Sequence, residues 1–192
     1  MTTDATSPDL ASRRLATVLE HVRLENSHDL EGLMSTFGST GFYDDAPWDQ
    51  HHEGLDAVRA YYAALLRAAP DFHIEVVSAR AAQDAVVLEV RLTGTHRGTW
   101  RGLPATGRTI DIPICAIFTF DAQDRLAGER IYYDRATVLR QLGVFFEPDT
   151  MSGKLLTPLL HPLTMLRALR EFAAPRPAAQ PERAQSSSGV NR

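Results

Sequence analysis

The chain has 192 residues, of which 44% are hydrophobic and 23% charged, and this is enough apolar material for the core of one domain. The formal net charge of −4 leaves no excess of cations to neutralise phosphates, so we expect no nucleic-acid partner. A lone cysteine, Cys115, excludes an internal disulfide and a cysteine-based metal site. The first residues lack the pattern of a secretory signal, and no apolar run reaches membrane-spanning length, which predicts a cytoplasmic protein.

The first third of the chain has the pattern of helices. Residues 1–8 are polar, and we expect them to be disordered. Apolar residues at helical spacing from Leu15 to Val22 predict a first amphipathic helix, and those from Leu30 to Phe37 predict a short second one. Residues 41–47 are typical of a short strand that leads into a loop. A third helix is predicted over residues 55–66.

The middle of the chain has the period of β-strands. Four segments rich in β-branched and aromatic residues are separated by turn-forming stretches: 72–80, 85–94, 108–120 and 126–135. Their short connections predict an antiparallel meander, and Pro113 predicts a bulge or an edge within the longest strand. Because long strands in a small sheet twist and bend, we predict one α+β domain over residues 9–147, in which a curved antiparallel sheet wraps around the N-terminal helices and encloses an apolar pocket.

The C-terminal region differs in kind from the domain before it. Residues 148–172 are strongly apolar but interrupted by Pro158 and Pro162, and they predict a helical extension too broken to span a bilayer. We favour packing over the pocket mouth or at a dimer interface. Peripheral membrane contact is the alternative, although we do not expect a membrane partner. Residues 173–192 are rich in Ala, Pro, Ser and Gln, and they predict a disordered tail.

Acidic residues stand among aromatic residues in two places, and these are the candidate catalytic sites. Asp45 lies between Tyr43 and Trp48, and Asp134 follows Tyr132 and Tyr133. An apolar pocket disfavours the charged form of a carboxyl group and makes it a proton carrier near neutral pH. Asp45 and Asp134 are therefore the leading acid–base pair. The alternatives are a turn aspartate for Asp45 and a helix cap for Asp134.

The two tyrosines of the last strand are candidates for the same chemistry. Tyr132 and Tyr133 alternate across the strand, so only one of them can face the pocket and donate to an enolate oxygen. His51, His52 and Glu53 are the nearest approach to a metal cluster, but adjacent residues point in different directions. We interpret them as a solvated loop and expect no metal site.

Several short motifs of the sheet half resemble those of a known family. They are Gly94-Thr95-His96-Arg97-Gly98, the loop Gly102-Leu103-Pro104-Ala105-Thr106-Gly107-Arg108, Asp134, and Gln141-Leu142-Gly143. Together they look like the SnoaL-like polyketide cyclases of the nuclear transport factor 2-like superfamily. The resemblance spans roughly residues 9–143. It implies a cone-shaped α+β barrel, a homodimer, and closure of a polyketide ring by aldol condensation without a cofactor.

The resemblance carries over one catalytic residue. Alignment of the turn around Asp124 places Ile117 and Ile131 where the family's cyclases have a histidine and an aspartate, so the standard pair is absent and both isoleucines are expected to contact substrate. The superfamily's ketosteroid isomerases place a base aspartate nine positions before a glycine, as Asp45 precedes Gly54. The resemblance therefore implies that Asp45 is the base, and Asp134 and a tyrosine stay its candidate partners on the grounds given above.

These features lead to two functional hypotheses and a weaker third. The first is a cofactor-independent acid–base enzyme, a cyclase or isomerase, for a small hydrophobic carbonyl compound that is polyketide-like or steroid-like. Trp48, His96 and Trp100 would contact this substrate, although the last two could instead belong to a plain hairpin connection. The second is a non-catalytic protein that binds a small molecule or scaffolds a partner. The third is a membrane-associated protein that uses the leucine-rich C-terminal segment.

Overall fold

The computed structural model describes residues 8–173, and the chain divides after Phe145 into two compact units. Most of the two segments expected to be disordered, residues 1–8 and 173–192, lies outside the described residues. Two residues of these segments are described: Pro8 is the first residue of the first helix, and Ala173 is the last residue of the last helix.

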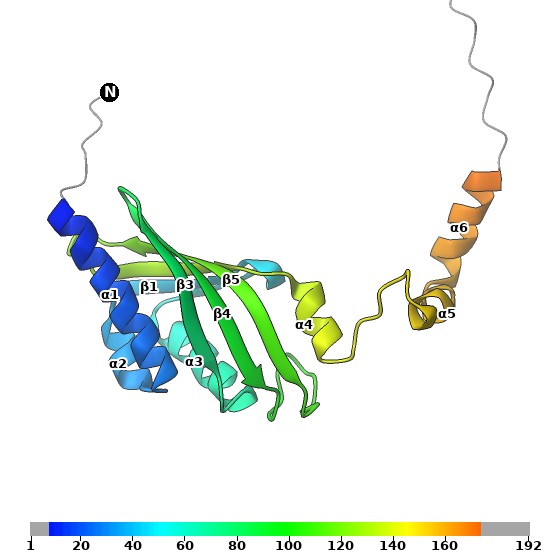
Figure 1. Ribbon diagram of the computed structural model, residues 1–192, viewed down its shortest axis with the longest axis horizontal. Coiled ribbons are helices and arrows are strands. Elements are labelled where there is room, and N and C mark those ends of the chain that lie inside the picture. The colour runs from blue at the N-terminus through cyan, green and yellow to red at the C-terminus, as the bar shows by residue number, and fades with distance from the viewer. Residues whose placement is uncertain (1–7, 174–192) are drawn as a thin grey trace, which may run out of the picture. The chain divides into compact units, whose positions relative to one another are not determined.

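The first unit combines helices with one curved six-stranded sheet (Figure 1), which confirms the predicted fold class. Its helices are α1 (Pro8–Asn26), α2 (Leu30–Ser35), α3 (Leu55–Ala68) and α4 (Arg135–Gln141), with a 3-10 turn at Ala46–Trp48. Its strands are β1 (Phe37–Asp45), β2 (Gln50–Glu53), β3 (His73–Ala81), β4 (Ala85–Thr95), β5 (Thr109–Phe120) and β6 (Leu126–Tyr132).

The sheet order is β2-β1-β6-β5-β4-β3. Strands β3 to β6 form the expected antiparallel meander. β1 pairs with β6 in parallel, which the sequence did not indicate, because this contact joins segments far apart in the chain. The parallel pair places the carboxyl end of β1, with Asp45, beside Ile131 of β6.

Two local predictions are corrected. Phe37 belongs to β1 and not to the second helix, because it pairs with Leu126 and is buried in the core. The segment of His51 to Glu53 is strand β2 and not a solvated loop. Asp49 adopts a left-handed conformation with φ of 52°, which reverses the chain and allows β2 to pair antiparallel with β1.

Pro113 lies in a part of β5 that pairs with only one neighbouring strand. It pairs in regular register with Arg91 of β4, and the pairing of β5 with β6 begins only at Cys115. The proline therefore stands at a locally unpaired edge of a central strand, where its missing N–H costs no ladder hydrogen bond.

The core lies between the sheet and the helices α1 and α3. Val18 of α1 and Val58 of α3 are fully buried, so these helices present their apolar sides to the sheet. The buried side of α1 differs from the predicted one, because Leu19 is 41% exposed whereas His21 is fully buried. A polar side chain thus takes a place at the centre of the core.

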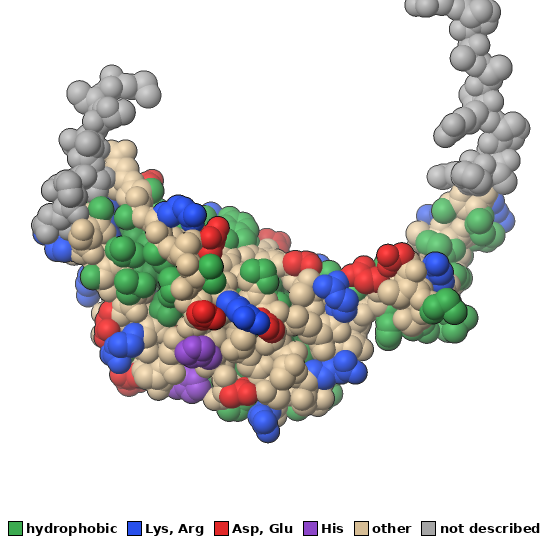
Figure 2. All heavy atoms as spheres, viewed as in Figure 1, with side chains coloured by type: hydrophobic (Ala, Val, Ile, Leu, Met, Phe, Trp, Pro, Cys, Tyr) green, Lys and Arg blue, Asp and Glu red, His purple; other side chains and the backbone are tan. Residues whose placement is uncertain are grey.

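The second unit contains α5 (Met151–Leu160) and α6 (Pro162–Ala173). Pro158 lies within α5, and Pro162 is the first residue of α6, where its missing N–H is tolerated. Leucines of both helices are exposed: Leu155, Leu159, Leu160, Leu163 and Leu169. Figure 2 shows green hydrophobic side chains on the surface of this unit. None of the helices within residues 8–173 combines the length and apolar character needed to cross a bilayer. What covers these leucines stays a prediction.

Candidate functional site

An apolar cavity of about 80 Å³ lies between the curved sheet and the helices α1, α3 and α4. Valine, leucine, isoleucine and phenylalanine side chains make up most of its wall. The polar groups in the wall are Glu25, Glu129, His96 and the tyrosines Tyr43, Tyr61 and Tyr133. A space of this size takes several water molecules, a small ligand or one end of a longer ligand.

The strand register orders these polar groups along the cavity. Glu129 pairs with Phe118, and Phe118 pairs with Val86 at the start of β4. His96 follows the last residue of β4, at the other end of that strand. Glu129 and His96 therefore stand at opposite ends of the cavity, and Tyr133, which follows β6, lies between them.

Asp45 is held behind this wall by three hydrogen-bond donors. Its carboxylate is fully buried and accepts hydrogen bonds from the hydroxyls of Tyr61 at 3.1 Å and Tyr133 at 3.2 Å. Nη2 of Arg101 forms a salt bridge to the same carboxylate at 2.5 Å. Tyr61 and Tyr133 line the cavity and separate Asp45 from it, so Asp45 is linked to the cavity only through these two tyrosines.

Trp48 and Trp100 pack around the guanidinium of Arg101. This group lies 4.4 Å from the Trp48 ring and 5.0 Å from the Trp100 ring, and the Trp48 indole N–H donates to the Tyr133 hydroxyl at 2.8 Å. The predicted ligand residue Trp100 lines the cavity, whereas Trp48 supports Tyr133 and Arg101. Burial, followed by the charge of Asp45, raises the pKa of both Tyr61 and Tyr133 well above the ordinary value, so both hydroxyls keep their protons.

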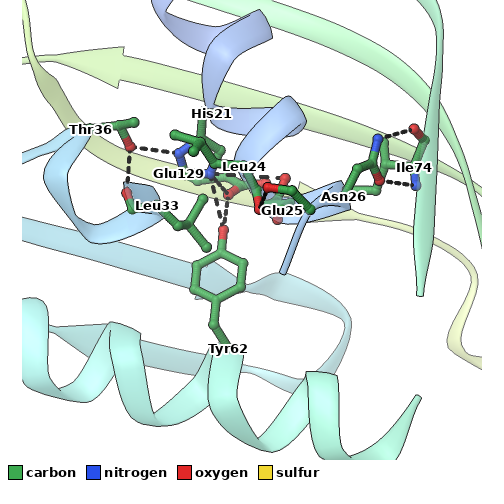
Figure 3. Close-up of polar contacts among 10 residues, drawn as sticks. His21, Leu24, Glu25, Asn26, Leu33, Thr36, Tyr62, Ile74 and Glu129 are labelled. Atoms are coloured by element: carbon green, nitrogen blue, oxygen red, sulfur yellow. Dashed lines mark hydrogen bonds and ion pairs between the residues drawn. The ribbon is translucent and has the colours of Figure 1, made fainter. Parts of the chain in front are cut away.

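A second polar cluster surrounds Glu129, at one end of the cavity (Figure 3). His21 and Glu25 come from α1, Tyr62 from α3 and Glu129 from β6, and all four side chains are buried. Nε2 of His21 lies 3.5 Å from a carboxylate oxygen of Glu129 and 4.0 Å from one of Glu25. The Tyr62 hydroxyl donates to Glu129 at 2.7 Å.

Hydrogen bonds fix the orientation of the His21 ring. The Thr36 hydroxyl donates its only hydrogen to the carbonyl oxygen of Leu33 at 2.7 Å, so it accepts from Nδ1–H of His21 at 2.8 Å. Nε2 of His21 is thereby turned toward Tyr62 and the two carboxyl groups. This arrangement joins an imidazole to an acid pair in an apolar surrounding.

The two glutamates cannot both be ionised at low cost. Burial, followed by the charge of Glu129, raises the pKa of Glu25 well above its ordinary value. Burial thus favours the protonated form of Glu25, while Glu129 accepts the hydrogen bond of Tyr62, so the pair is able to combine an acid with a base.

His21, Glu25 and Glu129 are also the described residues whose ligand atoms could hold a metal ion, since these atoms lie within 4.8 Å of one another. One imidazole and two carboxylates form a donor set suited to a divalent transition metal.

Three residues predicted from the sequence lie away from the cavity. Asp134 is exposed and caps α4, where its carboxylate accepts from the backbone N–H groups of Ala136 and Thr137. Tyr132 is 45% exposed beside Asp44, because the alternation of β6 turns Tyr133 inward. Ile117 faces the opposite side of β5 from the cavity residues Ala116 and Phe118. Ile131 and His96, by contrast, line the cavity.

Sequence reasoning missed His21, Glu25 and Glu129. Two signals could have found them. His21 and Glu25 stand at helical spacing from the buried Val18 and Val22. Glu129 lies two residues before the buried Ile131, so both side chains point to the same face of the last strand. A polar residue on a buried stripe is the pattern that points to a functional group.

Comparison with solved structures supports this fold. AclR, a proposed hydroxylase from Streptomyces galilaeus, is 26% identical, with a TM-score of 0.60 over 69% of this chain and 96% of that chain. A proposed SnoaL-like polyketide cyclase from Jannaschia sp. CCS1 is 20% identical, with a TM-score of 0.62 over 72% and 96% of the two chains. A protein with a ketosteroid isomerase-like fold from Catenulispora acidiphila, solved with trimethylamine, is 18% identical, with a TM-score of 0.58 over 72% and 95%.

A search of the curated proteins gave no match. The sequence model of the SnoaL-like polyketide cyclases matches residues 11–142, which include every polar group of the cavity. With the six-stranded sheet and its enclosed cavity in place, this match shows that the chain belongs to the SnoaL-like polyketide cyclase family.

Proposed function

We propose that the chain is a cofactor-independent enzyme that performs acid–base chemistry on a small hydrophobic carbonyl compound, as a cyclase or an isomerase. The observation that carries this proposal is the buried pair of Glu25 and Glu129, which lines an apolar cavity and in which burial favours the protonated form of Glu25. Such a pair supplies both a base and an acid near neutral pH.

Each member of the pair has one role. Glu129 acts as the base and removes a proton from the carbon next to the substrate carbonyl, and the electron pair of the broken C–H bond forms an enolate. Glu25 then delivers its proton, either to carbon in an isomerisation or to the new alkoxide in a ring closure. His21 and Tyr62 position the pair through their contacts with Glu129.

The tyrosines beside Asp45 have a supporting role. The Tyr133 hydroxyl faces the cavity and keeps its proton, so it can turn from Asp45 to a ligand oxygen and stabilise negative charge. Asp45 was the base expected from the sequence. Its contacts with Arg101, Tyr61 and Tyr133 favour a positioning role, since these three donors already occupy the carboxylate oxygens.

Hydrogen–deuterium exchange tests the proposal. Wild-type protein is incubated in deuterated water with a panel of hydrophobic ketones and keto esters, and uptake of deuterium next to the carbonyl is read by mass spectrometry. We expect Glu129→Gln to abolish exchange and Asp45→Asn to reduce it. Asp134→Asn, which keeps the helix cap, serves as the control and should exchange like the wild type. Deuterium exchange that persists in Glu129→Gln but is lost in Asp45→Asn would identify Asp45 as the base instead of Glu129.

A second candidate function is non-catalytic binding or scaffolding in the same cavity. It is favoured by the mostly apolar wall and by the salt bridge that occupies Asp45. Tight binding of panel members without any exchange would support this function, and an exchange product that depends on Glu129 would exclude it.

Assembly as a homodimer and a place in the cytoplasm belong to the same proposal. The family resemblance and the exposed leucines of α5 and α6 support a dimer. Light scattering of the full chain and of a Leu159→Ser, Leu163→Ser variant tests it, with a monomeric variant as the expected result.

A further inference from the structure

His96 is a polar side chain of the cavity to which the proposed chemistry gives no role. It lies at the opposite end of the cavity from Glu129 and is only 2% exposed. Its Nε2 atom is shielded from solvent and has no hydrogen-bond partner among the described residues. An unpaired buried polar atom of this kind costs free energy in the empty protein, and a ligand can recover that cost.

The neighbours of the ring determine which nitrogen carries the hydrogen. The backbone N–H of Thr106 points at Nδ1 of His96 over 3.3 Å, and an amide N–H can only donate. Nδ1 is therefore the acceptor, and the Thr106 hydroxyl at 3.1 Å donates to the same atom. In the neutral ring the hydrogen must then stand on Nε2.

The ring is neutral under physiological conditions. Burial lowers the pKa of His96, and the nearby backbone of Gly98 opposes this shift only in part. An uncharged N–H donor in an apolar wall matches an uncharged oxygen acceptor better than a carboxylate, because a carboxylate would lose its hydration without gaining a counter-charge.

We infer that Nε2–H of His96 forms a hydrogen-bond subsite for a neutral carbonyl or ester oxygen of the ligand. The location of this subsite adds a requirement on shape. Because the strand register places Glu129 level with the start of β4, whereas His96 follows its end, a substrate that reaches both must be elongated, with one oxygen remote from the carbon that reacts. This second statement rests on the proposed function, and the first does not.

The experiment compares two probes of nearly equal shape. The affinities of 2-acetylnaphthalene and 2-ethylnaphthalene, which differ in one carbonyl oxygen, are measured by calorimetry. We expect the wild type to prefer the ketone roughly three- to tenfold, the range of one hydrogen bond to a neutral group. In His96→Phe this preference should vanish while the hydrocarbon still binds.

A matched control comes from β2. His52 also has a buried Nε2 without a partner, but it borders a different surface depression, so His52→Phe should keep the preference for the ketone. If the wild type does not distinguish the two probes, whether both bind or neither does, the inference is overturned. A ketone preference that survives in His96→Phe overturns it as well.

Nitrogen NMR of the histidine side chains gives a readout that needs no ligand. The expected result at neutral pH is a His96 ring with hydrogen on Nε2 and a bare Nδ1. An imidazolium, or a ring with hydrogen on Nδ1, contradicts the inference. A chain that prefers the ketone through His96 yet shows no deuterium exchange would keep the subsite and refute the proposed enzyme.

Discussion

Arg101→Met is predicted to destabilise the first unit severely. Asp45 is fully buried and the Arg101 side chain is 15% exposed, so the substitution leaves a buried carboxylate with only the two tyrosine hydroxyls. Removal of one partner from a buried pair costs about 3–5 kcal/mol. For a domain of this size that corresponds to a fall in the melting temperature of roughly 10–15 °C.

The assay is equilibrium unfolding in urea, followed by far-ultraviolet circular dichroism. A double-mutant cycle with Asp45→Asn isolates the interaction, and we expect a coupling free energy of about 2–3 kcal/mol. Arg91→Met provides the control, because Arg91 forms a comparable pair with Asp111 whose side chains are 55% and 46% exposed. An exposed pair should contribute less than about 1 kcal/mol.

Two results would refute this reasoning. One is an Arg101→Met variant that loses no more stability than Arg91→Met. The other is a double variant whose loss equals the sum of the two single losses, which would show that Arg101 and Asp45 do not stabilise each other.

Three further predictions concern the cluster, the loop of His96 and the cap of α4. Burial raises the pKa of Glu25 in the folded state above the value of about 4.5 that it has in the unfolded chain. The unfolded state therefore loses this proton at a lower pH than the folded state, so the melting temperature should fall as the pH rises above 4.5. Glu25→Gln should remove this part of the pH dependence of the melting temperature. In Gly98→Ala the new Cβ would collide with the backbone carbonyl of Arg67, so unfolding in urea should show a loss of about 1–3 kcal/mol; an unchanged midpoint would contradict the contact. Asp134→Ala removes a helix cap and should cost about 1 kcal/mol in the same assay, without a change in probe affinity.

The sequence by itself determined the class of fold and most of its elements. Hydrophobic periodicity distinguishes helices from strands through local geometry, and the switch of period after Pro70 separates the helical part from the meander. The alternation of Tyr132 and Tyr133 also required that one of them face the pocket, and the structure selects Tyr133.

The composition of the site was decided only by the tertiary structure. Glu25 and Glu129 are more than 100 residues apart in the chain, and they meet because α1 packs on the sheet and β6 turns Glu129 inward. The parallel pairing of β1 with β6, a contact between distant segments, fixes where Asp45 lies. Sequence patterns report the periodicity of one segment, whereas acid pairs, salt bridges and unpaired donors depend on which segments pack together. For this reason Asp45 could be singled out from the sequence, whereas its salt bridge to Arg101 and the pairing of Glu25 with Glu129 could not.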